Sequence, residues 1–153
     1  VEAISPMLFD EDVKIAQFIA DAHLQPELVK AGIEGGFDAL LFHGTGLGHL
    51  PISDPQDDSV ENTVLRLMLE DHCANDGVVV VVAQTIEGPI NMNVYAKGRE
   101  QQAMGIIGHG SLCPPTSALV KLHHLLSRGE GRDGVAAGWV EDLCGENPDD
   151  SRE

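Results

Sequence analysis

The stretch that decides the fold is Val78-Val79-Val80-Val81-Val82-Ala83. Five consecutive β-branched valines disfavour a helix, because branching at Cβ restricts the side-chain rotamers that a helix allows. A continuous apolar run is typical of a strand in a parallel sheet, where helices cover both faces. The preceding Asn75-Asp76-Gly77 favours a turn. The segment therefore predicts a central, buried strand of an α/β domain.

Strand and helix patterns alternate on both sides of this segment. They predict a small doubly wound, Rossmann-like parallel sheet of about four strands, with helices on both faces. The other strands are expected at 13–20, 39–42 and 105–108. Helices are expected from Pro26 to Gly35, from a capping box of Asp58 and Glu61 onward, over 98–104, from Pro114-Pro115, and from a cap at Asp133. The side chains expected to be buried are Leu28, Val29 and Ile33 in the first helix, Val60, Val64, Leu67 and Met68 in the second, and Val135, Trp139 and Leu143 in the last.

Length and charge limit the classes of protein to consider. The 153 residues suit one domain, with a linker end at 1–11 and an acidic, frayed tail at 145–153. The 25 acidic and 9 basic residues give a net charge of -16, which argues against direct binding to nucleic acid or to anionic membranes. The acidic residues are spread along the chain, as in an ordinary acidic cytosolic protein or in one adapted to high salt. We favour the halophilic interpretation.

The three cysteines, Cys73, Cys113 and Cys144, include no close pair, so they do not form a disulfide framework. A reducing cytoplasm fits this pattern best, and no signal peptide is visible. Because the chain begins with Val1, we expect it to be processed or to be part of something longer.

Two loops follow the predicted strands at the edge of the sheet where ligands bind in such folds, at 43–51 and 84–97. Both are rich in groups that bind small polar molecules, namely Thr45, His49, Gln84, Thr85, Asn91, Asn93 and Tyr95. These loops are the candidate functional site.

A nucleotide or metal site is disfavoured at these loops. Gly44-x-Gly46 begins a dinucleotide fingerprint, but His49 stands at the third glycine position and no helix follows at once. A metal site built from His43, His49, His109 and Cys113 would lack the close ligand pairs of zinc sites. We therefore expect no cofactor and no metal.

Three motifs resemble the C-terminal domain of L-asparaginases, and more closely that of the D-subunit family of archaeal glutamyl-tRNA(Gln) amidotransferases. They are the strand and glycine loop from Phe37 to Pro51, the stretch from Ala83-Gln84-Thr85 through Gly88 to Arg99, and Pro115 followed by 118–122. Their order and spacing agree over residues 13–127.

The resemblance implies an amidohydrolase whose catalytic threonines lie in an N-terminal domain that this chain lacks. It implies that the present domain helps to form a dimer and to hold the amino-acid end of the substrate, and that a tRNA-binding protein chain is a possible partner. The substrate-binding residues implied are Thr45, His49, Asn91 and Asn93, with loop backbone from Gly44, Gly46 and Gly48. His49 stands where bacterial asparaginases have a substrate-contacting asparagine. No catalytic residue is expected in this chain.

The sequence also departs from the family. Thr85, Ile86, Glu87 and Pro89 replace a usual cysteine, aromatic and arginine, and Pro115-Thr116 replaces Pro-Glu. Two alternatives therefore stay open: both loops serve packing and dimer contacts alone, or the chain is a standalone amino-acid-binding module of asparaginase-like fold.

Overall fold

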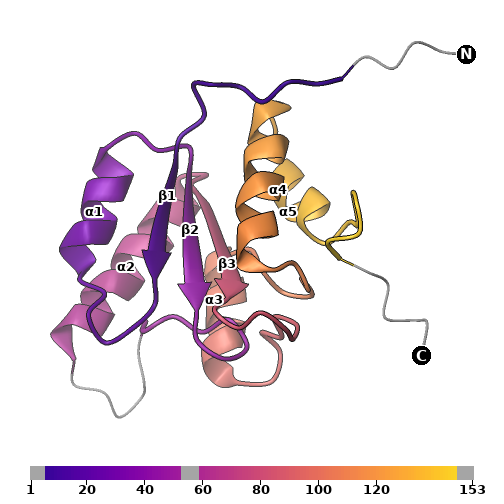
Figure 1. Ribbon diagram of the computed structural model, residues 1–153. Helices are drawn as coiled ribbons and strands as arrows, with labels where there is room; N and C mark the ends of the chain where they lie inside the picture. Colours follow the sequence, from indigo (N-terminus) through magenta and orange to yellow (C-terminus); the bar gives the residue numbers. More distant parts are fainter. Residues whose placement is uncertain (1–5, 53–58, 148–153) are drawn as a thin grey trace, which may run out of the picture.

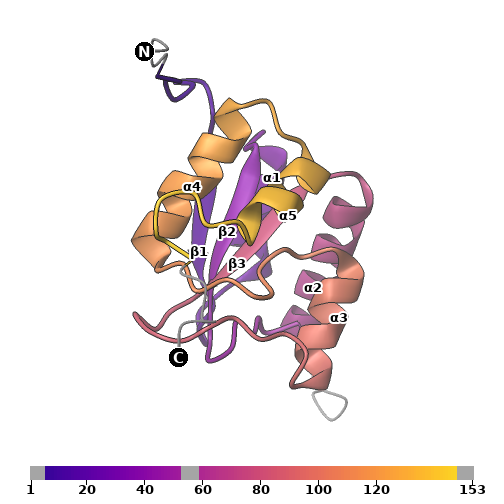
Figure 2. The same ribbon diagram turned by 90° about the vertical axis from the view of Figure 1, so that its right-hand side faces the viewer.

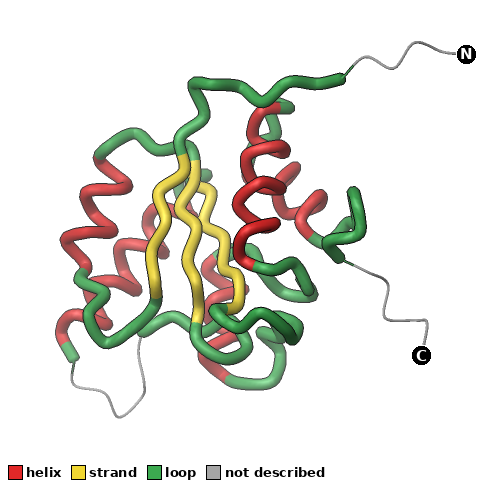
Figure 3. The backbone as a smooth tube through the Cα atoms, in the orientation of Figure 1, coloured by secondary structure: helices red, strands yellow, loops and turns green. Residues whose placement is uncertain are grey.

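The computed structural model describes residues 6–52 and 59–147 and shows a three-layer α/β arrangement around a parallel sheet (Figure 1). The sheet contains β1 (Ile15–Ile19), β2 (Ala39–Gly44) and β3 (Val78–Ala83), in that spatial order. Residues Ile15, Ala39 and Val78 are in register across it. The three strands run side by side in Figure 3. The predicted fold class is confirmed, and the valine strand is fully buried as predicted, but β2 and not β3 is the central strand of the three.

Helices cover both faces of the sheet. They are α1 (Pro26–Glu34), α2 (Val60–Ala74), α3 (Ala96–Met104), α4 (Pro115–Ser127) and α5 (Arg132–Trp139). Figures 1 and 2 place α1 and α2 on one face and α4 and α5 on the other, with α3 beside the lower part of the sheet.

The strands divide their side chains between two apolar cores, because successive residues of a strand point to opposite faces. Leu40, Phe42, Val79 and Val81 belong to the core beneath α1 and α2. Ala39, Leu41, Val78, Val80 and Val82 belong to the core beneath α4 and α5, together with Trp139 and Leu122. The run of β3 is therefore continuously apolar because helices cover both faces of the sheet, as predicted.

The fourth strand expected at 105–108 is reduced to a single bridge in the described chain. Ile107 donates its N–H to the Val79 carbonyl of β3 and accepts from the Val81 N–H, at 2.9 and 2.8 Å. Gly108 lies so close to Val81 that a Cβ on it would be 2.7 Å from the Val81 carbonyl oxygen. The chain turns away after this bridge.

The expected buried face of α2 is wrong. Its buried residues are Leu65, Leu69 and Cys73, whereas Val60, Val64 and Leu67 are exposed and Met68 is half-buried. The helix carries two apolar stripes, and the one spaced four residues apart faces the core. Ser59 caps the helix by accepting the Asn62 N–H at 3.2 Å, whereas the expected cap, Asp58, lies outside the described residues.

Three further expectations fail at exposed positions. In α1, Val29 is buried as predicted and Ile33 half-buried, but Leu28 is exposed. The last helix buries Val135 and Trp139, but it ends at Trp139, so the exposed Leu143 lies beyond it. Its N-cap is Gly131, which places Asp133 inside the first turn.

The described ends of the chain pack against α4. Phe9, from the expected linker, stacks on His123 with ring centroids 4.9 Å apart. The tail is not frayed as far as residue 147. The buried Lys121 Nζ lies 2.7 Å from Glu146, and Asn147 donates to the Trp139 carbonyl at 2.8 Å. We call Lys121, Glu146 and Asn147 the C-terminal cluster. Its many partners explain why these polar residues are ordered.

None of the helices in residues 6–52 and 59–147 is long and apolar enough to cross a membrane.

Candidate functional site

The glycine loop (residues 44–50) is a tight turn at the end of β2. Thr45 and His49 form an antiparallel bridge, in which the Thr45 and His49 N–H groups each donate to the other's carbonyl at 2.9 Å. Gly46 and Gly48 have φ of +51° and +96°, which L side chains rarely adopt. A Cβ on Gly44 would lie 2.8 Å from the Gly48 carbonyl carbon. The three glycines are thus what the closed loop requires.

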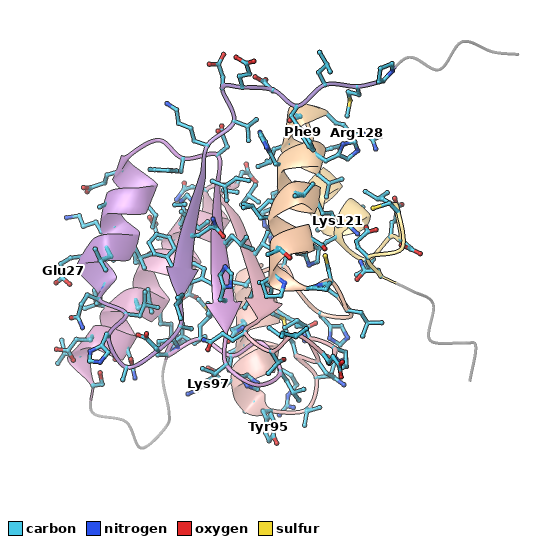
Figure 4. All side chains as sticks on the ribbon, in the orientation of Figure 1. Phe9, Glu27, Tyr95, Lys97, Lys121 and Arg128 are labelled. Carbon is cyan, nitrogen blue, oxygen red and sulfur yellow. The ribbon has the colours of Figure 1, made fainter. Side chains whose placement is uncertain are left out.

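The asparagine loop (residues 84–95) follows β3 and lies against the glycine loop. Ile90 packs on Gly48, where a Cβ would come within 2.7 Å of its Cδ1. The Tyr95 ring meets the His49 ring edge-on, with centroids 5.3 Å apart. Figure 4 shows Tyr95 and Lys97 at the end of the sheet toward which the strands run. The two loops that the sequence singled out therefore form one surface.

Gln84 ties the ends of all three strands together beneath this surface. Its side-chain Nε2 donates to the carbonyls of Ala20 and His43, both at 2.8 Å, and its backbone N–H donates to the Gly44 carbonyl at 3.0 Å. The side chain of Gln84 is thus engaged by the scaffold.

The two predicted asparagines use their side chains to shape their own loop. Asn91 Oδ1 accepts the Asn93 N–H at 3.1 Å. The Asn93 amide contacts His109 Nε2 at 3.0 Å and accepts from Gln102 at 3.0 Å. His109 Nδ1 in turn accepts the Met92 N–H at 3.2 Å. Ligand binding by Asn93 would have to compete with these contacts.

Thr45 is similarly engaged, since its hydroxyl donates to the His49 carbonyl at 3.2 Å. His49 differs from the other predicted residues. Its imidazole is half-buried, and Nε2 is shielded from solvent without a hydrogen-bond partner in the described chain. Burial lowers the pKa of His49 below its usual value, and the positive charge of Lys97 lowers it further. The imidazole is therefore neutral at pH 7, with one nitrogen able to donate and the other to accept.

Sequence reasoning missed the residue that holds the glycine loop in place. Gln101 of α3 is fully buried and hydrogen-bonds the loop backbone on both sides of His49, with Gly48 and Leu50 as partners. Its partners lie 51 and 53 residues away in sequence, so no local pattern could indicate the contact. A glutamine among the polar residues of α3 is otherwise typical of a solvated helix face.

The residues considered for a metal site do not form one in the described chain. No group of three His, Cys, Asp or Glu side chains in residues 6–52 and 59–147 is placed to hold an ion. His43 instead pairs with Gln17 at 3.3 Å, and Cys113 is buried, which raises its thiol pKa to about 11.

Relatives in sequence extend well beyond the length of this chain. The D subunit of glutamyl-tRNA(Gln) amidotransferase from Methanococcus maripaludis strain C5 is 36% identical over 119 residues, which are 76% of this chain and 25% of that protein. The corresponding D subunit from Methanopyrus kandleri is 33% identical over 121 residues, covering 78% of this chain and 23% of that protein. The chain thus spans about a quarter of the length of these relatives.

Solved structures and a family model agree with this likeness. L-asparaginase I from Vibrio cholerae superposes with a TM-score of 0.70 at 26% identity, covering 88% of this chain and 37% of that one. The thermostable L-asparaginase from Thermococcus kodakarensis superposes with a TM-score of 0.74 at 19% identity, covering 89% of this chain and 38% of that one. This is a likeness of fold. Residues 12–137 match the glutaminase/asparaginase C-terminal domain model. The chain therefore belongs to the glutaminase/asparaginase C-terminal domain family.

Proposed function

We propose that this domain completes the amino-acid site of an asparaginase-type amidohydrolase whose catalytic threonines belong to another domain. Family membership and the quarter-length match to the amidotransferase relatives support this proposal. Covalent amide cleavage requires an activated nucleophile. The sequence contains no Thr-Gly-Gly-Thr motif to supply one, so the chain alone binds or positions and does not cleave.

The observation that carries the proposal is the state of His49. The other predicted polar side chains, those of Thr45, Asn91 and Asn93, are already hydrogen-bonded to groups of the loops or of α3. His49 Nε2 has no partner in the described chain, and Tyr95, which packs on its ring, is itself 58% exposed. We expect a ligand or a second chain to reach Nε2 by local rearrangement of the loops, to which the exposed Tyr95 ring can contribute.

The charge beside His49 favours a carboxylate as the group that is bound. Lys97 lies near enough to the imidazole to lower its pKa, and the chain as a whole carries a net charge of -16. A cation beside an unpartnered imidazole in so acidic a protein attracts the α-carboxylate of an amino acid over a short range. Asparagine and glutamine, the amides of this enzyme class, both carry that group.

The loops also expose apolar side chains toward whatever completes the site. Ile86, Val94 and Tyr95 are all exposed on the asparagine loop. The proposal therefore includes a catalytic N-terminal domain and a homo-oligomer that cover this surface. It also includes a tRNA-binding protein chain as a further partner and a cytoplasmic location.

The chain alone provides the first test. We expect the purified 153 residues to release no ammonia from asparagine or glutamine. Turnover that disappeared on mutation of a residue of this chain would contradict the proposal, because it would place the catalytic group here.

A graft provides the second test. Residues 6–147 would replace the matching C-terminal region of the Methanococcus maripaludis strain C5 relative, so that α5 and the C-terminal cluster stay whole, and ammonia release from both amides would be measured. In an active graft, His49→Ala should raise KM and lower kcat/KM roughly tenfold, the effect of losing one charge-assisted hydrogen bond. His124→Ala on α4 is the control and should leave both constants unchanged.

An unchanged kcat/KM in the folded His49→Ala graft would overturn the substrate contact and leave the loop as an assembly element. A graft without activity, combined with saturable binding of an amino acid to the isolated chain, would instead favour a standalone binding module. Isothermal calorimetry with asparagine, glutamine and aspartate measures that binding.

A further inference from the structure

Gln101 holds the glycine loop through the two peptide groups that flank His49. Gln101 Nε2 donates to the Gly48 carbonyl and its Oε1 accepts the Leu50 N–H, both at 2.8 Å. The side chain is 0% exposed, so neither contact competes with water. The reverse amide orientation would place two donors together at Leu50 and two acceptors together at Gly48, so this orientation is the one that the surroundings permit.

The rest of α3 fixes where this amide stands. Gly98 packs so closely on the Met92 backbone that a Cβ would lie 2.5 Å from its carbonyl oxygen. After the helix, the Ile106 N–H donates to the Gln101 carbonyl at 3.0 Å. The helix is thereby fixed to both the asparagine loop and the segment that pairs with β3.

We propose that Gln101 is a positioning residue, which sets the direction of the His49 side chain by clamping the backbone before and after it. Without the clamp, the Thr45–His49 hydrogen bonds still close the loop, but Gly48, which has no side chain to restrict its φ of +96°, lets the closed loop shift relative to α3. The loop would then sample other orientations of His49. What His49 contacts rests on the proposed function, whereas the restraint of the loop by Gln101 does not.

The first experiment uses the 153-residue chain without substrate and tests whether Gln101 restrains the glycine loop. Gln101→Met keeps the size of the side chain and removes both hydrogen bonds. We expect amide hydrogen exchange at Leu50 to accelerate about ten- to a hundredfold relative to Val81 in β3, because a buried N–H loses its partner. The NMR-titrated pKa of His49 should rise toward its usual value as the imidazole gains solvent. Val135→Ala, in the core on the opposite face, is the control for lost stability and should change neither readout.

Gln101→Glu provides a reversible version and covers the case in which Gln101→Met does not fold. A protonated glutamic acid can accept from Leu50 and donate to Gly48, whereas the carboxylate repels the Gly48 carbonyl oxygen. Leu50 exchange in this variant, corrected for its intrinsic pH dependence, should approach the wild-type value at low pH and exceed it at high pH. The proposal is overturned if Leu50 exchanges in step with Val81 in both variants at every pH.

A functional readout separates this inference from the function itself. In the active graft, Gln101→Met should raise KM several-fold with little change in kcat, while Val135→Ala leaves KM unchanged at a temperature where both are folded. If the exchange results hold but His49→Ala does not affect KM, the clamp stands and the substrate contact fails. If the exchange results fail while His49→Ala raises KM, the substrate contact stands and Gln101 has no positioning role.

Discussion

The glycine loop and the C-terminal cluster show two opposite uses of polar side chains in one small domain. In the cluster, Lys121 and Glu146 are 2% and 6% exposed, and their charged atoms are paired with each other and with backbone groups. At the glycine loop, His49 Nε2 is also shielded from solvent but has no partner in the described chain. The paired groups of the cluster stabilise the fold, whereas His49 Nε2 keeps a hydrogen-bonding capacity that we propose a ligand uses. Shielding without a partner does not by itself mark a site, since Arg66 Nε, Arg132 Nε and Trp139 Nε1 share it in the described chain; His49 differs from them in lying where the two loops meet.

The largest expected effect comes from breaking the cluster. Lys121 donates to the Glu141 carbonyl, pairs with Glu146 and lies 6.0 Å from the centroid of the Trp139 ring. Lys121→Met leaves the Glu146 carboxylate buried without its partner, which should cost about 3–5 kcal/mol in the free energy of unfolding. Urea unfolding followed by circular dichroism measures this loss.

The control for that variant is Lys30→Met. Lys30 pairs with Glu34 at 3.5 Å on the exposed side of α1, and such pairs contribute roughly 0.5 kcal/mol or less. Equal losses in the two variants would contradict the view that the cluster is a structural element.

Acid should also break the cluster, because protonation of Glu146 removes its ion pair with Lys121. Burial by itself would raise the pKa of Glu146, but hydrogen bonds from Lys121 and from the Cys144 and Leu143 backbone N–H groups outweigh it and hold the pKa well below its usual value. A carboxyl with a lowered folded-state pKa contributes stability above its unfolded pKa of about 4.5, and this stability disappears as the pH falls toward the folded value. We expect the free energy of unfolding to decline below about pH 4.5, and to decline less in Glu146→Gln. Parallel pH profiles of the two proteins would rule out this origin.

Salt should act on the surface and leave the cluster unaffected. A net charge of -16 repels itself over distances near the ~10 Å Debye length at 0.1 M salt. We expect molar KCl to raise the melting temperature by at least about 5 °C, or roughly 1–2 kcal/mol, if the domain is adapted to high salt. The loss caused by Lys121→Met should be similar at both salt concentrations, because a buried pair is poorly screened. A melting temperature that stays flat up to molar KCl would remove the halophilic interpretation.

The smallest expected effect concerns the charge at the glycine loop. Lys97→Met should raise the pKa of His49 slightly, because it removes the cation while leaving the burial that lowers the pKa most. NMR titration of the His49 ring measures the change. His23→Ala, at an exposed position, serves as the control, and a His49 pKa unmoved by Lys97→Met would show that burial alone sets it.

The elements that sequence reasoning predicted well are those whose residues meet local partners or a continuous apolar environment. The valine strand, the Pro26 helix and its glycine stop follow from patterns within about ten residues. The glycine loop was also predictable as a candidate site, since three alternate glycines allow a tight backbone turn.

The failures share a different cause. Choosing between the two apolar stripes of α2 needs knowledge of which one faces the sheet, and the C-terminal cluster joins Lys121 to residues 20 or more positions away. The role of Gln101 depends on a backbone more than 50 residues distant. Tertiary packing sets such pairings, and no local periodicity in a single sequence indicates them.

The Gln84 hydrogen bonds have a mechanical consequence for the whole edge of the sheet at which the strands end. One side chain joins the last peptide groups of β1 and β2, and its own backbone completes the link to β3. We expect these shared bonds to make fraying of the strand ends more cooperative. Linked strand ends would leave adaptation to a ligand to exposed side chains such as Tyr95.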